Sequence, residues 1–149
     1  MKYRIFLAIA LLIIMLSFPL SALAANPSHV VKLQTTKSCQ FCNLTDAYLP
    51  VSRFDYTFFL GSDLSKANLM GSSITFSNLS RVNLNGANLR FVNFQHTKMP
   101  LADFTNAIFD KTDLTDADLI SAVISEAQLG KAKLCRTVLP NGLSSNRDC

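Results

Sequence analysis

The sequence is poor in the residues and motifs that carry catalysis. It has no tryptophan and only two histidines, His29 and His96. It contains no serine nucleophile elbow and no glycine-rich phosphate loop. We therefore expect no catalytic residues, no cofactor and no enzymatic activity.

Long apolar runs are also scarce, since only residues 5–18 form one, behind a basic start. A small-x-small pattern at residues 22–24 follows this run. Together these features predict a signal peptide over residues 1–25, with cleavage after Ala24 or Ala25. An uncleaved anchor is the alternative, but the run is short for a span of about 20 residues. We expect an exported protein, periplasmic or secreted by a bacterium, with no stable membrane span after cleavage.

Neither sign of charge is in large excess. Without Lys2 and Arg4, 12 basic residues stand against 10 acidic ones, and the signs are interspersed. A balance this even does not favour binding to nucleic acid or to an anionic membrane surface. It also lacks the acidic surface that a DNA mimic needs.

The strongest feature that is present is a period of five residues. Every fifth residue from Leu44 to Leu139 is large and apolar, which gives 20 centres without a gap. Two positions before each centre lies a small residue: alanine nine times, serine four times, threonine four times, valine twice and Cys42 once. A period of five fits neither an α-helix nor a flat strand. It predicts a solenoid in which stacked repeats bury one continuous apolar column.

Several repeats share the signature A-(D/N)-(L/F)-x-x. They are Ala67-Asn68-Leu69, Ala87-Asn88-Leu89, Ala102-Asp103-Phe104 and Ala117-Asp118-Leu119. Through these segments the chain resembles the pentapeptide repeat proteins, over about 100 residues. The resemblance implies an all-β fold, the right-handed quadrilateral β-helix with four repeats per coil. Residues 42–141 would then form about five coils, in a column of roughly 24 Å.

Both open ends of such a column need covers. Residues 26–41 form the expected N-terminal cap, with Ser28 as the N-cap of a short segment whose apolar face covers the first coil. After the repeats, Pro140-Asn141-Gly142 predicts a turn. The tail of residues 142–149 is expected to fold back over the last coil. The residues assigned to the face of the N-terminal cap are Val30, Val31, Leu33 and Gln34.

Four cysteines lie in two pairs, one at each end of the repeats. Cys42 and Cys135 are 93 residues apart. This separation is about 4.6 coils, or roughly 22 Å, so the four sulfurs cannot bind one zinc ion. The simplest pairing is two disulfides, Cys39–Cys42 and Cys135–Cys149, which an exported chain permits. A redox-active C-x-x-C is the alternative, but no thioredoxin-like pattern surrounds it.

Steps of 20 residues place side chains on the same face of successive coils. One such column reads Tyr56, Phe76, His96, Asp116 and Arg136. It predicts either a small ligand-binding strip or ladder packing of exposed side chains, and ladder packing is favoured because sites are usually concave. The two histidines of the chain lie several coils apart and cannot share a metal ion.

The fourth side of the predicted coil carries many apolar residues at outward positions. A contiguous patch of this kind would mark contact with a protein partner or self-association. Cover by the C-terminal tail and ordinary scattered surface residues are the alternatives. The residues of this candidate interaction face are Phe58, Leu60, Pro100, Leu101, Ile120 and Val138, with Pro140 beside them.

The favoured function is that of an exported, non-enzymatic structural or interaction protein. Its rigid column would present a fixed surface to a protein or envelope partner, with no role in nucleic-acid binding. Some acidic members of the family inhibit topoisomerases as DNA mimics, but the predicted export and the charge balance oppose that function here. A redox or ligand-binding role that uses the C-x-x-C is the other alternative.

Overall fold

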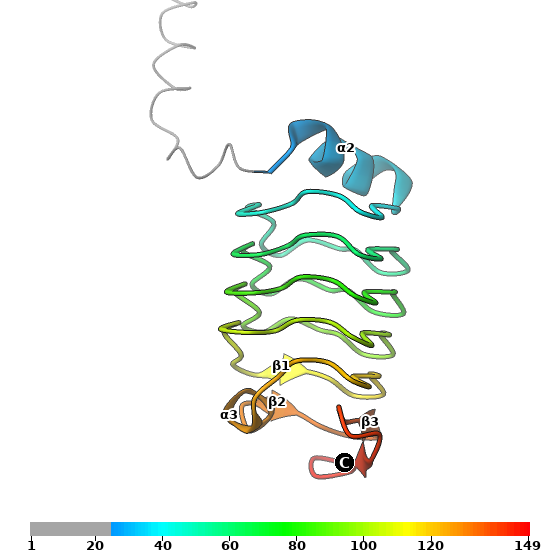
Figure 1. The fold of residues 1–149 in the computed structure, drawn as a ribbon, viewed down its shortest axis with the longest axis vertical. Helices are drawn as coiled ribbons and strands as arrows, with labels where there is room; N and C mark the ends of the chain where they lie inside the picture. Colours follow the sequence, from blue (N-terminus) through cyan, green and yellow to red (C-terminus); the bar gives the residue numbers. More distant parts are fainter. Residues whose placement is uncertain (1–24) are drawn as a thin grey trace, which may run out of the picture.

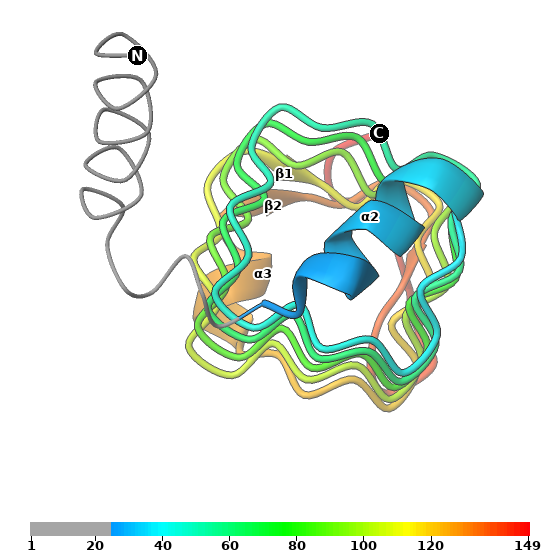
Figure 2. The same cartoon turned by 90° about the horizontal axis from the view of Figure 1, so that it is seen from above.

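The computed structural model describes residues 25–149, so the predicted signal peptide lies outside the described residues except for Ala25. The chain forms a column of stacked coils (Figure 1), and the view along its axis shows four sides around one core (Figure 2). Parallel bridges pair residues 20 positions apart, from Ser38 and Phe58 to Asp118 and Val138. One coil therefore contains four repeats of five residues, which confirms the predicted β-helix. We number the four sides by their first centres, Leu44, Leu49, Phe54 and Phe59.

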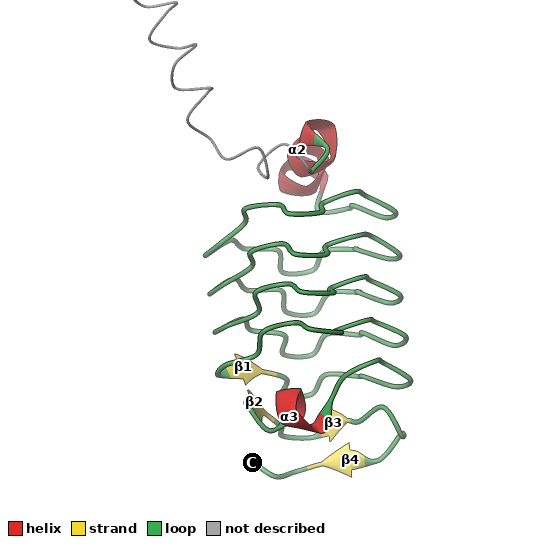
Figure 3. Cartoon of the chain, turned by 60° about the vertical axis from the view of Figure 1, so that its left-hand side comes forward, coloured by secondary structure: helices red, strands yellow, loops and turns green. Residues whose placement is uncertain are grey.

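Regular helices and strands are few and gather at the two ends of the column (Figure 3). Between the ends, adjacent coils pair through single-residue bridges. β1 pairs with β2 in parallel, and β3 pairs with β4 antiparallel. The elements are α2 (Pro27–Thr36), β1 (Thr112–Asp113), α3 (Glu126–Leu129), β2 (Ala132–Lys133), β3 (Thr137–Val138) and β4 (Ser144–Ser145).

The core is the column of centres that the period predicts. Of the 20 centres, 18 are buried, and only Ile124 and Leu139 are half-buried. The small residues two positions earlier are buried with them, except Ser52 and Ala127. Because each centre packs on the centres of the coils above and below, stability comes from neighbouring coils rather than from any single repeat.

The asparagine or aspartate that directly precedes a centre determines how the chain bends on that side of the coil. In all ten repeats that have one there, the side-chain oxygen accepts a hydrogen bond from the backbone N–H two residues later. These bonds are Asx turns, which fix the bend of the chain at each side. The abundance of these residues therefore reflects the coil.

Each coil turns its corners through residues in the left-handed region. The second residue after each centre from Leu44 to Leu119, and Arg136 after Leu134, has positive φ, from 51° at Lys111 to 71° at Gly71. Glycine, which adopts this conformation without strain, occupies few of these corners. Most carry a full side chain, at a cost of about 1–2 kcal/mol each. Most corner side chains are exposed, so the corners contribute to the surface of the column.

Buried hydroxyls at the small positions tie the coils together. Six of them donate to the carbonyl oxygen 23 residues earlier, for example Thr97 Oγ1 to Ile74 O at 2.6 Å and Ser72 Oγ to Leu49 O at 2.8 Å. Thr57 is the exception, because the residue 23 positions earlier is Gln34, inside α2. Its Oγ1 is buried and has no partner among the described residues.

One carboxylate also links two coils. Asp55 Oδ1 accepts hydrogen bonds from Ser73 Oγ, from Thr75 Oγ1 at 2.8 Å and from the Thr75 N–H at 2.9 Å. Burial alone would raise the pKa of Asp55, but these bonds and the charge of Arg53 outweigh it and lower the pKa overall. The ionised form of Asp55 therefore stabilises the fold.

The helix of the N-terminal cap begins at a different residue from the one expected. Asn26 is the N-cap of α2, because its Oδ1 accepts from the Ser28 N–H at 3.0 Å. Pro27 occupies the first helical position, where its fixed φ and missing N–H are tolerated. The prediction of Ser28 as the N-cap is wrong.

α2 covers the first coil with fewer side chains than expected. Leu33 is buried and Val30 is half-buried against the core. Val31 and Gln34 are exposed, so their assignment to the covering face is wrong. The physical reason is the helical period of about 100° per residue: Leu33 points at the core, while Val31 is turned by about 100° from Val30 and Gln34 by about 100° from Leu33.

The C-terminal tail folds back under the last coil. β4 pairs with β3, and Asp148 binds Leu134 twice, through its N–H to the carbonyl oxygen and through Oδ2 to the N–H, both at 2.8 Å. Arg147 donates to the carbonyl oxygens of Leu129 and Ala132. These bonds satisfy backbone groups at the open edge of the column, which would otherwise be a template for pairing with another chain.

The repeat is interrupted once, although the sequence period is unbroken. Ser125 caps α3 with a capping box, in which Gln128 N–H donates to Ser125 Oγ and the Ser125 N–H donates to Gln128 Oε1. The short helix replaces the bridge that Gln128 would form with Ile108, and Ala127 becomes exposed. Ser-x-x-Gln is a readable capping signal, and here the local signal overrides the period.

Candidate interaction surfaces

The predicted strip on the third side is a continuous ladder of stacked side chains. The Tyr56 and Phe76 rings stack with centroids 5.2 Å apart, and Phe76 stacks on the His96 ring at 4.5 Å. His96 Nδ1 lies 3.6 Å from Asp116 Oδ2. Arg136 then binds both Asp116 oxygens, through Nε and Nη2, at 2.6 Å each. The strip therefore runs from two aromatic rings to an ion pair over five coils.

The charged end of this ladder is held by its own residues. The hydrogen bonds from Arg136 hold the pKa of Asp116 below its ordinary value, and the same contact raises the pKa of Arg136. Both faces of the Phe76 ring are covered, by the rings of Tyr56 and His96. A shallow groove of about 330 Å³ runs beside Phe76 and His96, towards Lys98. These contacts support ladder packing over a ligand-binding strip.

The candidate interaction face on the fourth side consists of two groups of apolar residues with polar residues between them. Phe58 and Leu60 lie on the first coil, while Leu101 and Ile120 lie on later coils. Between them the register places Asn78, Ser80 and Arg81. Phe58, Leu101 and Ile120 are exposed, whereas Leu60, Pro100, Val138 and Pro140 are half-buried.

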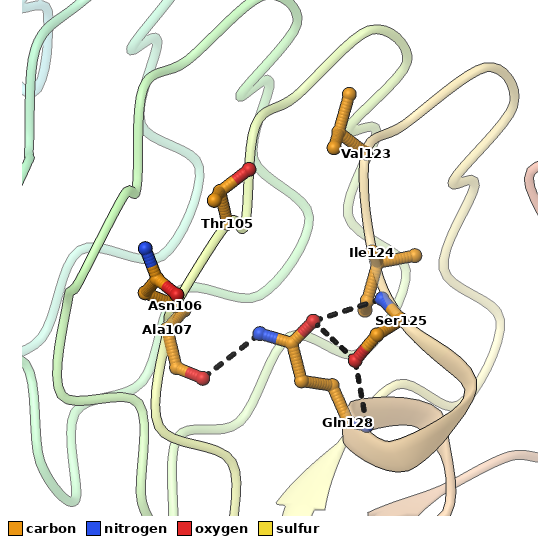
Figure 4. A pocket seen from close by; sticks show the side chains of 7 residues that line it. All are labelled: Thr105, Asn106, Ala107, Val123, Ile124, Ser125 and Gln128. Atoms are coloured by element: carbon orange, nitrogen blue, oxygen red, sulfur yellow. Dashed lines mark hydrogen bonds between the residues drawn. The ribbon is translucent and has the colours of Figure 1, made fainter.

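A pocket of about 490 Å³ opens beside α3, where the last coil is interrupted (Figure 4). Gln128 reaches across it and donates through Nε2 to Phe104 O at 2.7 Å and to Ala107 O at 2.9 Å. Its Oε1 accepts from the N–H and Oγ of Ser125. The amide of Gln128 thus replaces part of the missing ladder, and its polar atoms are already paired with Ser125 and with the carbonyl oxygens of Phe104 and Ala107.

Sequence reasoning missed an apolar surface at the N-terminal end of the second side. Val31 of α2 and Tyr48 line one pocket of about 360 Å³ between the helix and the first coil. Val51 lies beside Met70, whose carbonyl oxygen accepts from its N–H at 2.9 Å. All four side chains are exposed, Val51 by 77%. We call Val31, Tyr48, Val51 and Met70 the upper patch.

The upper patch contains an unusual corner. Val51 has φ of 53°, and no other corner of residues 25–149 with positive φ carries a β-branched residue. A β-branched side chain in this region is a genuine conformational outlier. Because Val51 is mostly exposed, packing does not account for the residue. The signal in the sequence was a valine at the corner position of the second side, which the period alone could have located.

The cysteines form one disulfide at each end, Cys39–Cys42 and Cys135–Cys149. Both sulfurs of the C-x-x-C pair belong to buried residues. His29 links α2 to the first coil, because its Nδ1 accepts a hydrogen bond from the Asn43 N–H at 2.9 Å.

Across residues 25–149, no three potential ligands gather into a metal site. Over the same residues, no helix has the length and apolar character that crossing a bilayer requires.

Comparison with known proteins decides the family. The family model for pentapeptide repeats matches residues 38–71, 67–106 and 101–136, with eight copies. The chain belongs to the pentapeptide repeat family. Members of this family form right-handed quadrilateral β-helices, which agrees with the four-sided coils described above. No curated protein matches this pentapeptide repeat protein in sequence.

Solved structures share its fold. HetL, a pentapeptide repeat protein involved in heterocyst differentiation regulation in the cyanobacterium Nostoc sp. strain PCC 7120, is 23% identical with a TM-score of 0.61. The match covers 72% of this chain and 53% of HetL, so this chain spans about half of that protein. Rfr23 from the cyanobacterium Cyanothece 51142 is 20% identical with a TM-score of 0.48, over 81% of this chain and 95% of Rfr23. At these identities the likeness concerns the fold alone.

Proposed function

We propose that this pentapeptide repeat protein is an exported, non-enzymatic interaction protein whose upper patch binds a protein partner. Export rests on the signal-peptide pattern of residues 1–25. The interaction role rests on apolar side chains that lie together and exposed at one end of a rigid column. The fourth-side face is a weaker candidate, because polar residues divide it.

The backbone conformation of Val51 is the strongest support for this proposal. Val51 occupies a strained corner with φ of 53° and is 77% exposed. An asparagine or glycine there would relieve about 1–2 kcal/mol of backbone strain. Strain at an exposed position that contributes little to packing is typical of a residue retained for function. The partner would bury Val51 together with Tyr48 and Met70.

The test separates stability from binding. Val51→Asn is expected to raise the free energy of unfolding by about 1 kcal/mol, because Asn tolerates positive φ. The same change is expected to weaken partner binding. Lys66→Asn is the matched control, because Lys66 is an exposed corner of the first side with φ of 57°. Tagged wild-type and variant proteins would be captured from their own cells and the bound proteins compared by mass spectrometry.

The expected result is one protein that is recovered with wild type and Lys66→Asn and lost with Val51→Asn. Equal recovery with both variants would contradict the assignment of the patch. Export is tested separately, by cell fractionation and N-terminal sequencing. A mature N-terminus at Ala25 or Asn26 outside the cytoplasm is expected, whereas an unprocessed cytoplasmic chain would contradict it.

A further inference from the structure

The two disulfides differ in how well an external thiol can reach them. Cys39 and Cys42 are 0% and 2% exposed, beneath α2. In the other pair Cys135 is buried, but Cys149 is exposed at the end of the tail. Thiol–disulfide exchange requires an attacking thiolate to approach one sulfur directly, so access decides which bond reacts. Only Cys149 among the four meets that requirement.

The surroundings of Cys135 favour its departure as the leaving thiolate. Arg136 Nη1 lies 3.4 Å from Cys135 Sγ. The other two nitrogens of this guanidinium bind Asp116, which fixes the group in place and leaves Nη1 for the sulfur. A neighbouring cation stabilises a thiolate, and a better leaving thiolate accelerates exchange.

We propose that Cys135–Cys149 is a reactive disulfide that a dithiol reductant, such as a thioredoxin-type protein, opens at Cys149. The attacking thiolate forms a bond to Cys149 Sγ, and the bond between the sulfurs of Cys149 and Cys135 breaks. The electron pair of that bond passes to Cys135, which leaves as a thiolate beside Arg136. The second thiol of the reductant, after losing its proton, displaces Cys149. The products are two cysteine thiols and an oxidised reductant.

Opening this bond would loosen the cover of the last coil. Without it, the tail is held by the short β3–β4 pairing and by the hydrogen bonds of Arg147 and Asp148. These contacts are mostly exposed and are individually weak in water. Their loss would uncover the backbone groups of Leu134 and of the neighbouring edge. The C-x-x-C pair, which the sequence presents as the redox candidate, would stay closed.

The experiment uses the oxidised protein under native conditions. It is treated with reduced glutathione, quenched with N-ethylmaleimide over time and mapped by mass spectrometry. We expect a glutathione adduct on Cys149 and none on Cys135, with the Cys39–Cys42 bond reacting at least about tenfold more slowly. Equal opening of both disulfides, or an adduct on Cys135, would overturn the proposal.

A second measurement tests the role of Arg136. Arg136→Gln is expected to slow formation of the Cys149 adduct by about three- to tenfold, while Arg136→Lys retains part of the rate. Lys133→Gln is the matched control, because Lys133 belongs to the same coil but contacts Asp113. An equal rate in Arg136→Gln and Lys133→Gln would refute the proposed stabilisation of the leaving sulfur.

Discussion

The buried hydroxyl ladder predicts that one chemical change will have opposite effects at two equivalent positions. Thr97 and Thr57 both occupy small positions and are 1% and 0% exposed. Thr97 Oγ1 donates to Ile74 O at 2.6 Å, whereas Thr57 Oγ1 has no partner among residues 25–149. Replacement by valine keeps the shape and removes only the hydroxyl. Val82 occupies a small position on the first side and is 1% exposed, so the coil accommodates a valine at a position of this kind.

The expected change in stability depends on which hydrogen-bonding groups lose a partner when the hydroxyl is removed. In Thr97→Val the buried carbonyl oxygen of Ile74 loses its only described donor, which costs about 1–3 kcal/mol. In Thr57→Val a buried hydroxyl without a partner disappears, so stability is expected to stay unchanged or to rise by about 1 kcal/mol. The two variants should therefore differ by about 2 kcal/mol or more.

Urea denaturation followed by circular dichroism measures this difference. With an m-value of about 1–3 kcal/mol/M for a domain of this size, the midpoints should differ by about 1 M urea, with equal m-values. The reasoning would be refuted if Thr57→Val destabilised the protein as much as Thr97→Val. That result would mean that valine itself disturbs the packing and that the hydroxyl bond contributes little.

Three further predictions test other contacts. Asp55→Asn should flatten the acid limb of the stability curve. Because the pKa of Asp55 is lower in the folded state than its ordinary value of 3.8, its carboxylate stabilises the fold above that value. This stabilisation is lost as the pH falls through the folded-state pKa, and urea midpoints measured at a series of pH values would show the loss. Gln128→Glu should lower stability at neutral pH by about 1–3 kcal/mol and recover part of it in acid, because a carboxylate cannot donate to carbonyl oxygens. Gly61→Ala should lower the melting temperature more than Gly86→Ala. Both glycines have positive φ, but only at Gly61 would the added Cβ lie 2.6 Å from a ring atom, that of Phe41. Equal decreases in melting temperature would show that the ring moves freely.

The period of five contained enough information for the fold and its register. A strict repeat predicts a solenoid that buries every centre from Leu44 onward. The 20-residue coil comes from the resemblance to pentapeptide repeat proteins, which implies four repeats per coil. The interruption at α3 does not follow from the period, because Ala127 and Leu129 keep it. It follows from Ser125 and Gln128, whose side chains compete locally with the ladder for backbone groups.

The surface was less predictable, for a geometric reason. Periodicity assigns a residue to a side and to a coil, but the upper patch also includes Val31, which comes from a helix outside the period. Where α2 docks depends on the Asn26 N-cap and on the burial of Leu33. A shift of one residue in that helix would rotate Val31 away from Tyr48 by about 100°. The patch is therefore a property of the docked cap, which the repeat alone does not define.

The corners of the coil connect this geometry to function. Left-handed backbone at most corners makes glycine, asparagine and aspartate the stabilising choices there, so each other residue at such a corner has an energetic cost. On the third side, the departures at Tyr56, Phe76 and His96 are offset by stacking with one another. Val51 has no such compensation within the described chain, because the next corner in its column is Gly71, which has no side chain to stack against it. A corner that is strained, exposed and without a stacking neighbour is explained by a contact made outside the chain, which is why we propose Val51, rather than the more apolar fourth side, as the centre of the binding surface.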